Sequence, residues 1–508
     1  MQRDQKFILG IGIDNVSLNE AVQEIISIIK DYPSDPRARY IATINTDFIN
    51  NSLCWNWPHI KNSELLSLLR RSSLSTCDST PLYWLSKLLG SSLKERVAGS
   101  NLLLPLLYSV AQNNFTVFLL GGTETDAQLA AARLTATIKN LKIVGIATPR
   151  LATEGPLLAV EPERDALLLE QIHSAKPDLL LVNLGNPKQE LWFARVSSEL
   201  KVPASIGIGG CFSFLSGSLL RAPEWMQKGG LEWLYRIFQE PGRLWKRYFF
   251  GIPKALYMAL PAVFYQRYCS FMYRLVYRNV EPILEKLRIR LYLASTRSIA
   301  VLELPSKLSN AYHEIHSDLI DQAFAHDHIV VDFKRVRHIT LEGISFLVGL
   351  WTRAHRQDKE LSGLSLSGDM RLLLKANRAW DILSAQQYQT VKDLATTLQQ
   401  SKYNSLYDTI HQDNKSIYIS FFGQLDNNQD YERIFTRFEP TLKDRHCTVD
   451  LTYCTTIESR GFSFLLRLKA HLQQQNRKLR LCCIHEEIRR QFELARLDKI
   501  FECIACRP

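Results

Sequence analysis

The chain has 508 residues, more than one ordinary hydrophobic core accommodates, so we expect about two to four domains. Its 46% hydrophobic and 22% charged residues are typical of a globular protein and exclude a disordered chain. The net charge of +11 favours an anionic partner.

The first residues, MQRDQKFILGIGIDNVSL, lack the pattern of a signal peptide and are interpreted as a first strand. No run of 18 apolar residues occurs, and the longest candidate, 252–265, is interrupted by Pro253, Lys254 and Pro261. We therefore expect no membrane-spanning helix. Ten cysteines in a chain of this size are interpreted as reduced, structural thiols, which is consistent with a cytoplasmic protein.

Apolar strand-like runs and helical patterns alternate through the first 215 residues. Strands are predicted at 40–45, 116–122, 142–148, 178–184 and 204–210, and helices at about 80–90, 100–112, 124–139, 164–174 and 188–199. This alternation predicts an α/β fold with a parallel sheet and helices on both faces. Glycines at the strand ends bring backbone amides where they can approach phosphate groups, although a tight turn explains them equally well.

The segment after this alternation is basic and aromatic. Residues 221–290 contain 13 Lys and Arg against 5 Asp and Glu. Basic side chains attract anionic lipid, and Trp and Tyr favour the headgroup region. Nucleic acid offers phosphate contacts and stacking to the same side chains, but no nucleic-acid-binding motif accompanies them. We therefore expect contact with an anionic membrane surface and no binding of nucleic acid.

Beyond residue 295 the sequence repeats itself with one offset of 118 residues. SIAVLEL at 298 matches SIYISFF at 416, and the same register continues through Gly343 and Gly461. Each copy shows the pattern strand, helix, strand, glycine-containing loop, helix, strand, helix. One ungapped offset over such a length predicts a tandem duplication.

Three stretches in order, ERVAGSNL, GNPKQELW and LEWLYRIFQEPGRLWKRYF, resemble the WecG/TagA/CpsF family of glycosyltransferases, and the resemblance covers about residues 7–250. Members transfer a sugar from a nucleotide diphosphate donor to a lipid-diphosphate-linked sugar at the bacterial cytoplasmic membrane. The resemblance implies a Rossmann-like parallel-sheet core with a helical basic appendage, peripheral on the inner face of the plasma membrane.

The resemblance also implies two catalytic residues. Asp78, in STCDSTPLYW, matches the proposed base that takes the proton from the acceptor hydroxyl. Without the resemblance, an Asp followed by Ser and Pro favours a cap on the next helix over a catalytic role. Arg96, in ERVAGSNL, matches the arginine expected to hold the diphosphate, and a surface ion pair with Glu95 is the alternative.

Substrate-binding positions follow from the same resemblance. Thr43, Asn45 and Asp47, in IATINTDFIN, suit hydrogen bonds to the sugar or nucleotide, with helix capping as the alternative for the last two. Gln189, in GNPKQELW, is assigned to the donor sugar or phosphate. Arg221, Arg236, Arg243 and Arg247 of the basic tail are expected to complete the diphosphate site while Trp225, Trp233 and Trp245 enter the headgroup layer. A solvated helix is the alternative for this tail.

Two residues depart from the family pattern. Ser79 stands where Gly is common, and Ser213 stands where Asp is common; both changes point to altered sugar specificity or a weakened enzyme. No two aspartates are two residues apart, so a metal-binding Asp-x-Asp pair is absent. We expect no metal and no cofactor, with Arg, Lys and backbone amides stabilising the departing diphosphate.

Each copy of the C-terminal repeat resembles the STAS domain, whose loop carries Asp-Ser-[Ser/Thr]-Gly with a phosphorylated serine. The first copy has Thr340-Leu-Glu-Gly343 there and the second has Glu458-Ser-Arg-Gly461, so Ser459 is the candidate regulatory residue. The lost motif favours a constitutive protein-binding role over phosphorylation, and a role in enlarging the fold stays open.

The predicted domains are a glycosyltransferase core at 1–215, a membrane-binding appendage at 216–250, an amphipathic interfacial linker at 251–295, and STAS-like domains at 296–400 and 414–508. We predict an inverting, metal-independent transferase that moves N-acetylmannosamine or its uronate from a UDP-sugar to a polyprenyl-diphosphate-linked sugar in cell-surface polysaccharide synthesis. The repeats would bind a protein partner, and a homo-oligomer is compatible with the sequence. The alternative is a scaffold that binds lipid-linked sugar without turnover.

Overall fold

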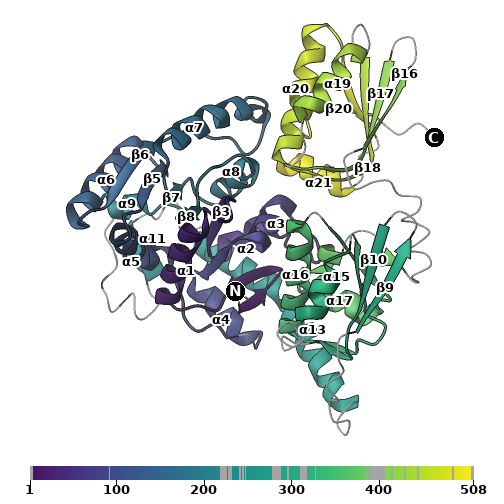
Figure 1. Ribbon diagram of the computed structural model, residues 1–508, viewed down its shortest axis with the longest axis horizontal. Coiled ribbons are helices and arrows are strands. Elements are labelled where there is room, and N and C mark those ends of the chain that lie inside the picture. Colours follow the sequence, from purple (N-terminus) through teal and green to yellow (C-terminus); the bar gives the residue numbers. More distant parts are fainter. Residues whose placement is uncertain are drawn as a thin grey trace.

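The computed structural model describes residues 4–90, 92–217, 223, 226, 232–239, 242, 245, 247–276, 288–294, 297–308, 317–326, 328–357, 359–383, 387–388, 407–412, 416–427, 431–442, 446–482 and 486–504. Within these ranges the chain forms a large α/β core domain and two smaller α/β units (Figure 1).

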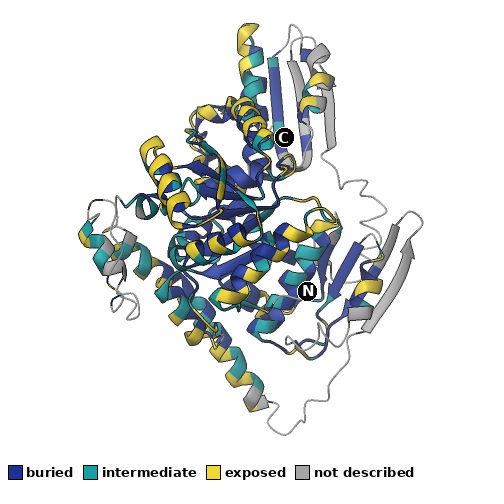
Figure 2. Cartoon of the chain, turned by 60° about the vertical axis from the view of Figure 1, so that its left-hand side comes forward, coloured by how far each residue is buried: buried dark blue, intermediate teal, exposed yellow. Residues whose placement is uncertain are grey.

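The core domain is built on a six-stranded parallel sheet, as the alternating pattern predicted. In spatial order its strands are β4 (Leu74–Cys77), β3 (Arg39–Ile44), β8 (Ala204–Gly207), β7 (Leu179–Asn183), β5 (Thr116–Gly121) and β6 (Lys142–Ala147). The helices are α1 (Leu18–Asp31), α2 (Thr46–Ser52), α3 (Ser63–Arg71), α4 (Thr80–Leu88), α5 (Gly99–Gln112), α6 (Glu124–Thr137), α7 (Glu161–Ala175), α8 (Lys188–Val196) and α9 (Phe212–Leu215). Figure 2 shows the central strands buried beneath helices with exposed outer faces.

Burial on both faces explains why the strands are continuously apolar. Along β5, Phe118 and Leu120 join one hydrophobic cluster, whereas Val117 and Leu119 join the cluster on the opposite face. Side chains of a strand alternate between its faces, so a strand covered by helices on both sides needs apolar residues at every position.

The N-terminal segment is a hairpin, so its interpretation as one strand is wrong. β1 (Gln5–Ile8) pairs antiparallel with β2 (Ile11–Asp14). Leu9 and Gly10 form the turn with φ of 50° and 84°. A Cβ on Gly10 would lie 2.7 Å from the Arg378 carbonyl oxygen, so this turn fits closely against the C-terminal half of the chain.

The two C-terminal units share one strand order. In repeat one (288–388) the strands lie in the spatial order β9-β10-β12-β14-β15, and in repeat two (407–504) they lie in the equivalent order β16-β17-β18-β19-β20. In each sheet the first of these strands is an antiparallel edge strand and the others are parallel. Repeat one contains β9 (Arg288–Ala294), β10 (Arg297–Glu303), β12 (His328–Asp332), β14 (Glu360–Leu364), β15 (Gln387–Tyr388), α15 (Ser317–Ala323), α16 (Leu341–Arg356) and α17 (Gly368–Ala376). Repeat two contains β16 (Tyr407–Gln412), β17 (Ser416–Leu425), β18 (His446–Ile457), β19 (Leu479–Cys482), β20 (Glu502–Ile504), α19 (Tyr431–Leu442), α20 (Ser459–Gln474) and α21 (Glu486–Leu494).

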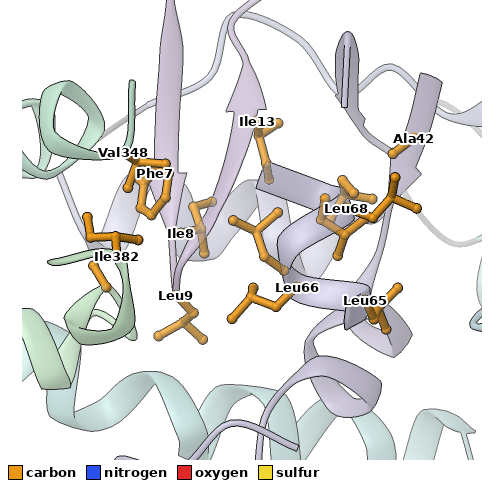
Figure 3. Close-up of a cluster of buried hydrophobic side chains, with 14 of the residues drawn as sticks. Phe7, Ile8, Leu9, Ile13, Ala42, Leu65, Leu66, Leu68, Val348 and Ile382 are labelled. Carbon is orange, nitrogen blue, oxygen red and sulfur yellow. The ribbon is translucent and has the colours of Figure 1, made fainter. Parts of the chain in front are cut away.

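Repeat one packs directly on the core domain. Figure 3 shows Val348 and Ile382 of this repeat beside Phe7, Ile8 and Leu9 of the N-terminal hairpin. All five side chains are buried in one hydrophobic cluster. The apolar core of the first domain therefore continues into the repeat, which favours a fixed arrangement of the two.

A long helix follows the basic appendage and precedes repeat one in the sequence. α11 (Glu232–Gln239) and a π-helical turn, Arg247–Gly251, precede α13 (Ile252–Val276), which contains Pro261. Ala255, Met258 and Ala262 of α13 are buried against the rest of the protein. In the part of the chain that the structure describes, no helix has the length and apolarity needed to cross a membrane.

Candidate active site

The carboxyl ends of β3 and β4 bring together two residues that the sequence singled out. Asn45 follows β3, and Asp78 follows β4, its neighbour in the sheet. The Asn45 Nδ2 atom donates a hydrogen bond of 3.3 Å to Asp78 Oδ2, and Asn45 Oδ1 accepts from the Asp47 backbone N–H at 2.9 Å. Asn45 therefore caps α2 and orients the Asp78 carboxylate at once.

The Asp78 carboxylate does not cap the helix that follows it. Ser79 is the N-cap of α4, and Asp78 Oδ1 instead accepts a 3.0 Å hydrogen bond from the backbone N–H of Gly99, the first residue of α5. The positive end of that helix dipole favours a negative carboxylate. The Asp78 side chain therefore does not cap α4, which was the alternative to a catalytic role.

Arg96 lies at the same strand end. Its Nη1 atom donates a 3.1 Å hydrogen bond to the Asp78 backbone carbonyl. The carboxylate of Glu95, proposed as an alternative partner, accepts from the Leu18 backbone N–H at 3.0 Å. A guanidinium and a carboxylate therefore lie together at the carboxyl ends of the strands, where open α/β sheets bind their ligands.

Thr43 and Gln189 are buried and hold the end of β8. Thr43 Oγ1 donates to the Gly207 carbonyl at 3.0 Å, and Gln189 Oε1 accepts from the Gly209 N–H at 3.2 Å. Gly209 has φ of 56° and open space where a Cβ would lie. Both side chains thus shape a glycine turn beside the Asn45 and Asp78 pair.

Glu190 was assigned no role from the sequence, and a buried acid was thus missed. Its Oε1 accepts from Tyr40 Oη and Gln189 Nε2, each at 2.7 Å, and its Oε2 accepts from Asn186 Nδ2 at 3.0 Å. Burial raises the pKa of Glu190 to about 7. The signal in the sequence was a tyrosine within the buried strand β3, because a buried hydroxyl needs a partner.

The two departures from the family pattern have different surroundings. Ser213 Oγ donates to Asp126 Oδ2 at 3.4 Å, and Ser216 Oγ donates to Asp126 Oδ1 at 2.9 Å. A carboxylate from α6 therefore reaches the position where the family has its own Asp. The Ser79 hydroxyl is buried and meets no hydrogen-bond partner among the described residues.

The basic tail is only partly described. Arg221, Arg243 and Trp225 lie outside the described residues, and the side chains of Arg236, Arg247 and Trp233 lie outside what the structure describes of their helices. Trp245 is exposed, with its ring centroid 5.7 Å from that of Phe250. The roles assigned to the arginines stay predictions.

A cavity of about 1060 Å³ lies at the opposite edge of the sheet, near the amino end of β3. Its lining includes Arg37, Arg39, Arg71, Lys201 and Arg356. Ligands of open α/β sheets bind at the carboxyl ends of the strands. We therefore locate the candidate site at the Asn45 and Asp78 edge and not in this cavity.

Comparison with known proteins gives two family matches. The glycosyl transferase WecG/TagA/CpsF family model matches residues 7–268, and the STAS domain model matches residues 397–506. One STAS domain is thus detected, over repeat two, so the predicted pair is confirmed for that copy alone. Repeat one has the same strand order as repeat two, but the STAS domain match does not extend to it.

Curated relatives carry one activity in their names. A Bacillus subtilis (strain 168) protein named N-acetylglucosaminyldiphosphoundecaprenol N-acetyl-beta-D-mannosaminyltransferase is 28% identical over 225 residues, which are 44% of this chain and 80% of the relative. A Staphylococcus aureus (strain MW2) protein of the same name is 26% identical over 240 residues, 47% of this chain and 85% of the relative.

Proposed function

This chain belongs to the WecG/TagA/CpsF family of glycosyltransferases, and we propose that it moves a sugar from a UDP-sugar to a polyprenyl-diphosphate-linked sugar. The observation that carries the proposal is the placement of Asp78. Asn45 and the first amide of α5 hold its carboxylate at the carboxyl edge of the sheet, and Arg96 lies beside it.

The proposed reaction is a single displacement with inversion at the donor sugar. The acceptor hydroxyl oxygen bonds to the anomeric carbon as the bond from that carbon to the UDP oxygen breaks. Asp78 takes the hydroxyl proton, and UDP leaves with the bonding electron pair. Arg96 and the amides of the glycine turn that follows β8 stabilise the negative charge on the departing diphosphate.

The sugar that we propose is N-acetylmannosamine or its uronate. The relatives are named for N-acetylmannosaminyl transfer to N-acetylglucosaminyl-diphosphoundecaprenol, and the matched region includes both strand ends of the site. Ser213 with Asp126 retains a carboxylate near the family position. We therefore favour an active enzyme over a scaffold that binds without turnover.

Membrane contact is proposed to run through α13. Its exposed side includes the large apolar side chains Leu256, Tyr257, Leu260, Phe264, Tyr268, Phe271 and Leu275. Lys254 and Arg267 are also exposed on this helix. The Asn50 side chain donates to the Gly251 carbonyl at 2.9 Å, which ties the start of α13 to the helix after Asn45. An apolar stripe with basic residues suits the anionic inner face of the plasma membrane.

The two repeats are proposed to be tandem STAS-like domains that bind a protein partner. Repeat one has the strand order of repeat two, and Gly343 and Gly461 are related by the sequence offset of 118 residues. A Cβ on either glycine would approach a carbonyl oxygen, that of Leu308 at 2.4 Å or that of Leu425 at 2.3 Å. Such close approach supports a duplicated fold.

A transfer assay on the purified full-length chain tests the proposal. The acceptor is a short-chain prenyl-diphosphate-N-acetylglucosamine, the donors are a panel of UDP-sugars, and half of the reactions contain EDTA. We expect product from one donor with and without EDTA, and product formation slower by about a hundredfold or more in Asp78→Asn. The variant Asp31→Asn, at an exposed residue of α1, should keep wild-type activity. Absence of product from every donor, with UDP binding intact, would contradict a transferase and support the scaffold.

A further inference from the structure

Both repeats make polar contacts with the part of the core domain that lies between Asn45 and Asp78. Each repeat also contacts the core elsewhere, as Ser345 does at the Gln5 carbonyl and Arg460 does at Glu199. Asn45 and Asp78 are 33 positions apart, and the intervening 46–77 segment contains α2, a loop, α3 and β4. The segment leaves the sheet after β3 and returns beside it as β4. Both of its ends are therefore residues of the candidate site.

Repeat one binds the loop of this segment through Arg378. This arginine is 1% exposed; its Nη1 donates to the His59 carbonyl at 2.7 Å and its Nη2 to the Cys54 carbonyl at 3.2 Å. Burial lowers the pKa of Arg378 to about 10, so the guanidinium stays charged at pH 7. One side chain of the repeat thus holds two carbonyls of the loop.

The last turn of α3 in turn reaches into repeat one. Arg70 is 4% exposed and donates to both carboxylate oxygens of Asp381, at 2.5 and 3.0 Å, and to the Arg378 carbonyl at 2.6 Å. Its Nε donates to the Gly10 carbonyl at 2.9 Å. Two buried arginines, one from each domain, therefore cross the same interface.

Arg71 extends this contact. Its Nη1 lies 2.8 Å from His355 Nε2 on α16. Burial, with the nearby Arg71 charge, lowers the pKa of His355 to about 4, so the imidazole is neutral at pH 7 and accepts this hydrogen bond.

Repeat two holds the first turn of α3. The carboxylate of Glu64 accepts from the Ser459 hydroxyl at 2.9 and 3.1 Å, from the Ser459 N–H at 3.2 Å and from Asn427 Nδ2 at 2.7 Å. Glu64 is buried at the start of α20, where the helix dipole favours a negative group. Each end of α3 is thus bound by a different repeat.

We propose that both repeats are positioning elements of the transferase, which place Asp78 by holding the 46–77 segment. The inference rests on the proposed function. α3 runs through Ser72 and Ser73 into β4, whose last residue precedes Asp78. A buried charge is stabilised only in the geometry that supplies its hydrogen bonds, so the contacts favour one position of α3. A misplacement of about 1 Å in a catalytic group costs roughly a hundredfold in rate.

A matched pair of variants tests the proposal in the full-length protein. Asp381→Asn removes the carboxylate that Arg70 binds across the interface. Asp321→Asn removes an ion pair with Arg353 that lies wholly within repeat one. We expect Asp381→Asn to lower kcat by about tenfold with the donor KM nearly unchanged, because a misplaced base slows the chemical step and not donor binding. Asp321→Asn should match the wild type.

Hydrogen exchange supplies a readout that does not depend on turnover. In Asp381→Asn we expect faster exchange of the amides of Asp78 and Gly99, which are bonded to Ile44 O and to the Asp78 carboxylate. Asp381→Glu should restore both kcat and protection. If Asp381→Asn does not fold, Arg378→Lys, which keeps the charge and loses the two-carbonyl contact, takes its place.

The outcomes separate this proposal from the proposed function. A wild-type protein without transfer activity refutes the function, and exchange at Asp78 and Gly99 then decides the positioning claim. Unchanged exchange in Asp381→Asn overturns the positioning claim. Faster exchange with an unchanged kcat in an active enzyme overturns it as well.

Discussion

The Glu64 carboxylate accepts hydrogen bonds from both the backbone N–H and the hydroxyl of Ser459, although the residues are 395 positions apart. Ser459 is the candidate regulatory residue, and it is 4% exposed with its hydroxyl directed at a carboxylate of another domain. A modifying enzyme reaches this hydroxyl only after repeat two separates from α3. The contact therefore supports the constitutive role over a phosphorylation switch.

The first prediction concerns this contact. Glu64→Gln replaces one acceptor oxygen by an NH₂ group that faces the donors of Ser459 and Asn427. A buried donor left without its acceptor costs about 1–3 kcal/mol. We expect the free energy of opening of α20, measured by hydrogen exchange in the full-length protein, to fall by that amount.

The control for this prediction is Glu432→Gln. Glu432 pairs with Arg467 within repeat two and is exposed, so its removal should leave exchange of α20 nearly unchanged. Equal effects of the two substitutions would show that Glu64 contributes no more than a surface charge.

The second prediction is that raising the pH loosens repeat two. Burial, with the Glu64 charge second, raises the pKa of Glu458 to about 8; Asp426 and Arg71 also face it. The unfolded carboxyl titrates near pH 4.3, so between about pH 4.3 and 8 the folded state binds the extra proton. The contribution of this proton to the free energy of unfolding is fully present below about pH 4.3. It decreases as the pH rises from there to about 8.

Calorimetry on the full-length chain at pH 6 and pH 9 checks this sign. The transition of repeat two should shift to lower temperature at pH 9, and Glu458→Gln, which is neutral at both values, should remove most of the shift. A shift that survives in Glu458→Gln would assign the pH dependence to another group.

The strands of the sheet could be predicted because each buried strand is a continuous apolar run in the local sequence. The predicted strand at 116–122 corresponds to β5 (Thr116–Gly121), since an apolar run with glycines behind it has few other interpretations. The hairpin at the N-terminus was not predictable in this way. Its turn depends on contact with Arg378, and no local pattern records a partner so distant in sequence.

The residues of the candidate site likewise fall into a predicted group and a group that local sequence patterns could not reveal. Asn45 and Asp78 were predicted as site residues, and the structure brings them together across adjacent strands. Glu190 was missed because its significance depends on Tyr40, 150 positions away. The pair Arg70 and Asp381, 311 positions apart, was missed for the same reason.

The third prediction tests the base. Asp78→Asn keeps the size of the side chain and the acceptor for the Gly99 N–H, but it cannot take a proton. General base catalysis contributes about a hundredfold to ten-thousandfold, so we expect kcat to fall by that factor with little change in donor KM. Single-turnover rates with the identified donor measure the effect. An Asp78→Asn enzyme with the wild-type kcat would show that another residue is the base.

The fourth prediction concerns the buried acid beneath the site. Tyr40→Phe removes the hydroxyl that donates to Glu190 Oε1, and this hydrogen bond holds the pKa of Glu190 down. We expect a loss of about 1–3 kcal/mol and a pKa of Glu190 above its present value of about 7. Because that raised pKa favours the protonated folded state, the loss should grow as pH rises from 6 to 8.

Thermal unfolding of the core at these two pH values measures this effect. Tyr108→Phe serves as the control, since Tyr108 lies exposed on α5. A Tyr40→Phe protein with the same pH dependence as Tyr108→Phe would mean that Glu190 titrates independently of Tyr40.

The fifth prediction concerns the exposed stripe on α13. Phe264 and Phe271 are 66% and 62% exposed to water. On a membrane surface both side chains would be buried in the headgroup region, which removes their apolar surface from water. The double variant Phe264→Asp, Phe271→Asp should abolish sedimentation with anionic liposomes. Leu167→Asp, at a residue 70% exposed on α7, should sediment normally.

Ionic strength separates the apolar and the electrostatic contributions to this binding. Exposed charges are screened within about 8 Å at physiological salt and within about 3 Å at 1 M, whereas burial of apolar area is not screened. Binding through the stripe should therefore persist in part in 1 M salt in the wild-type protein. Complete release by salt would assign membrane contact to the basic residues alone and would leave the exposed phenylalanines of α13 without this role.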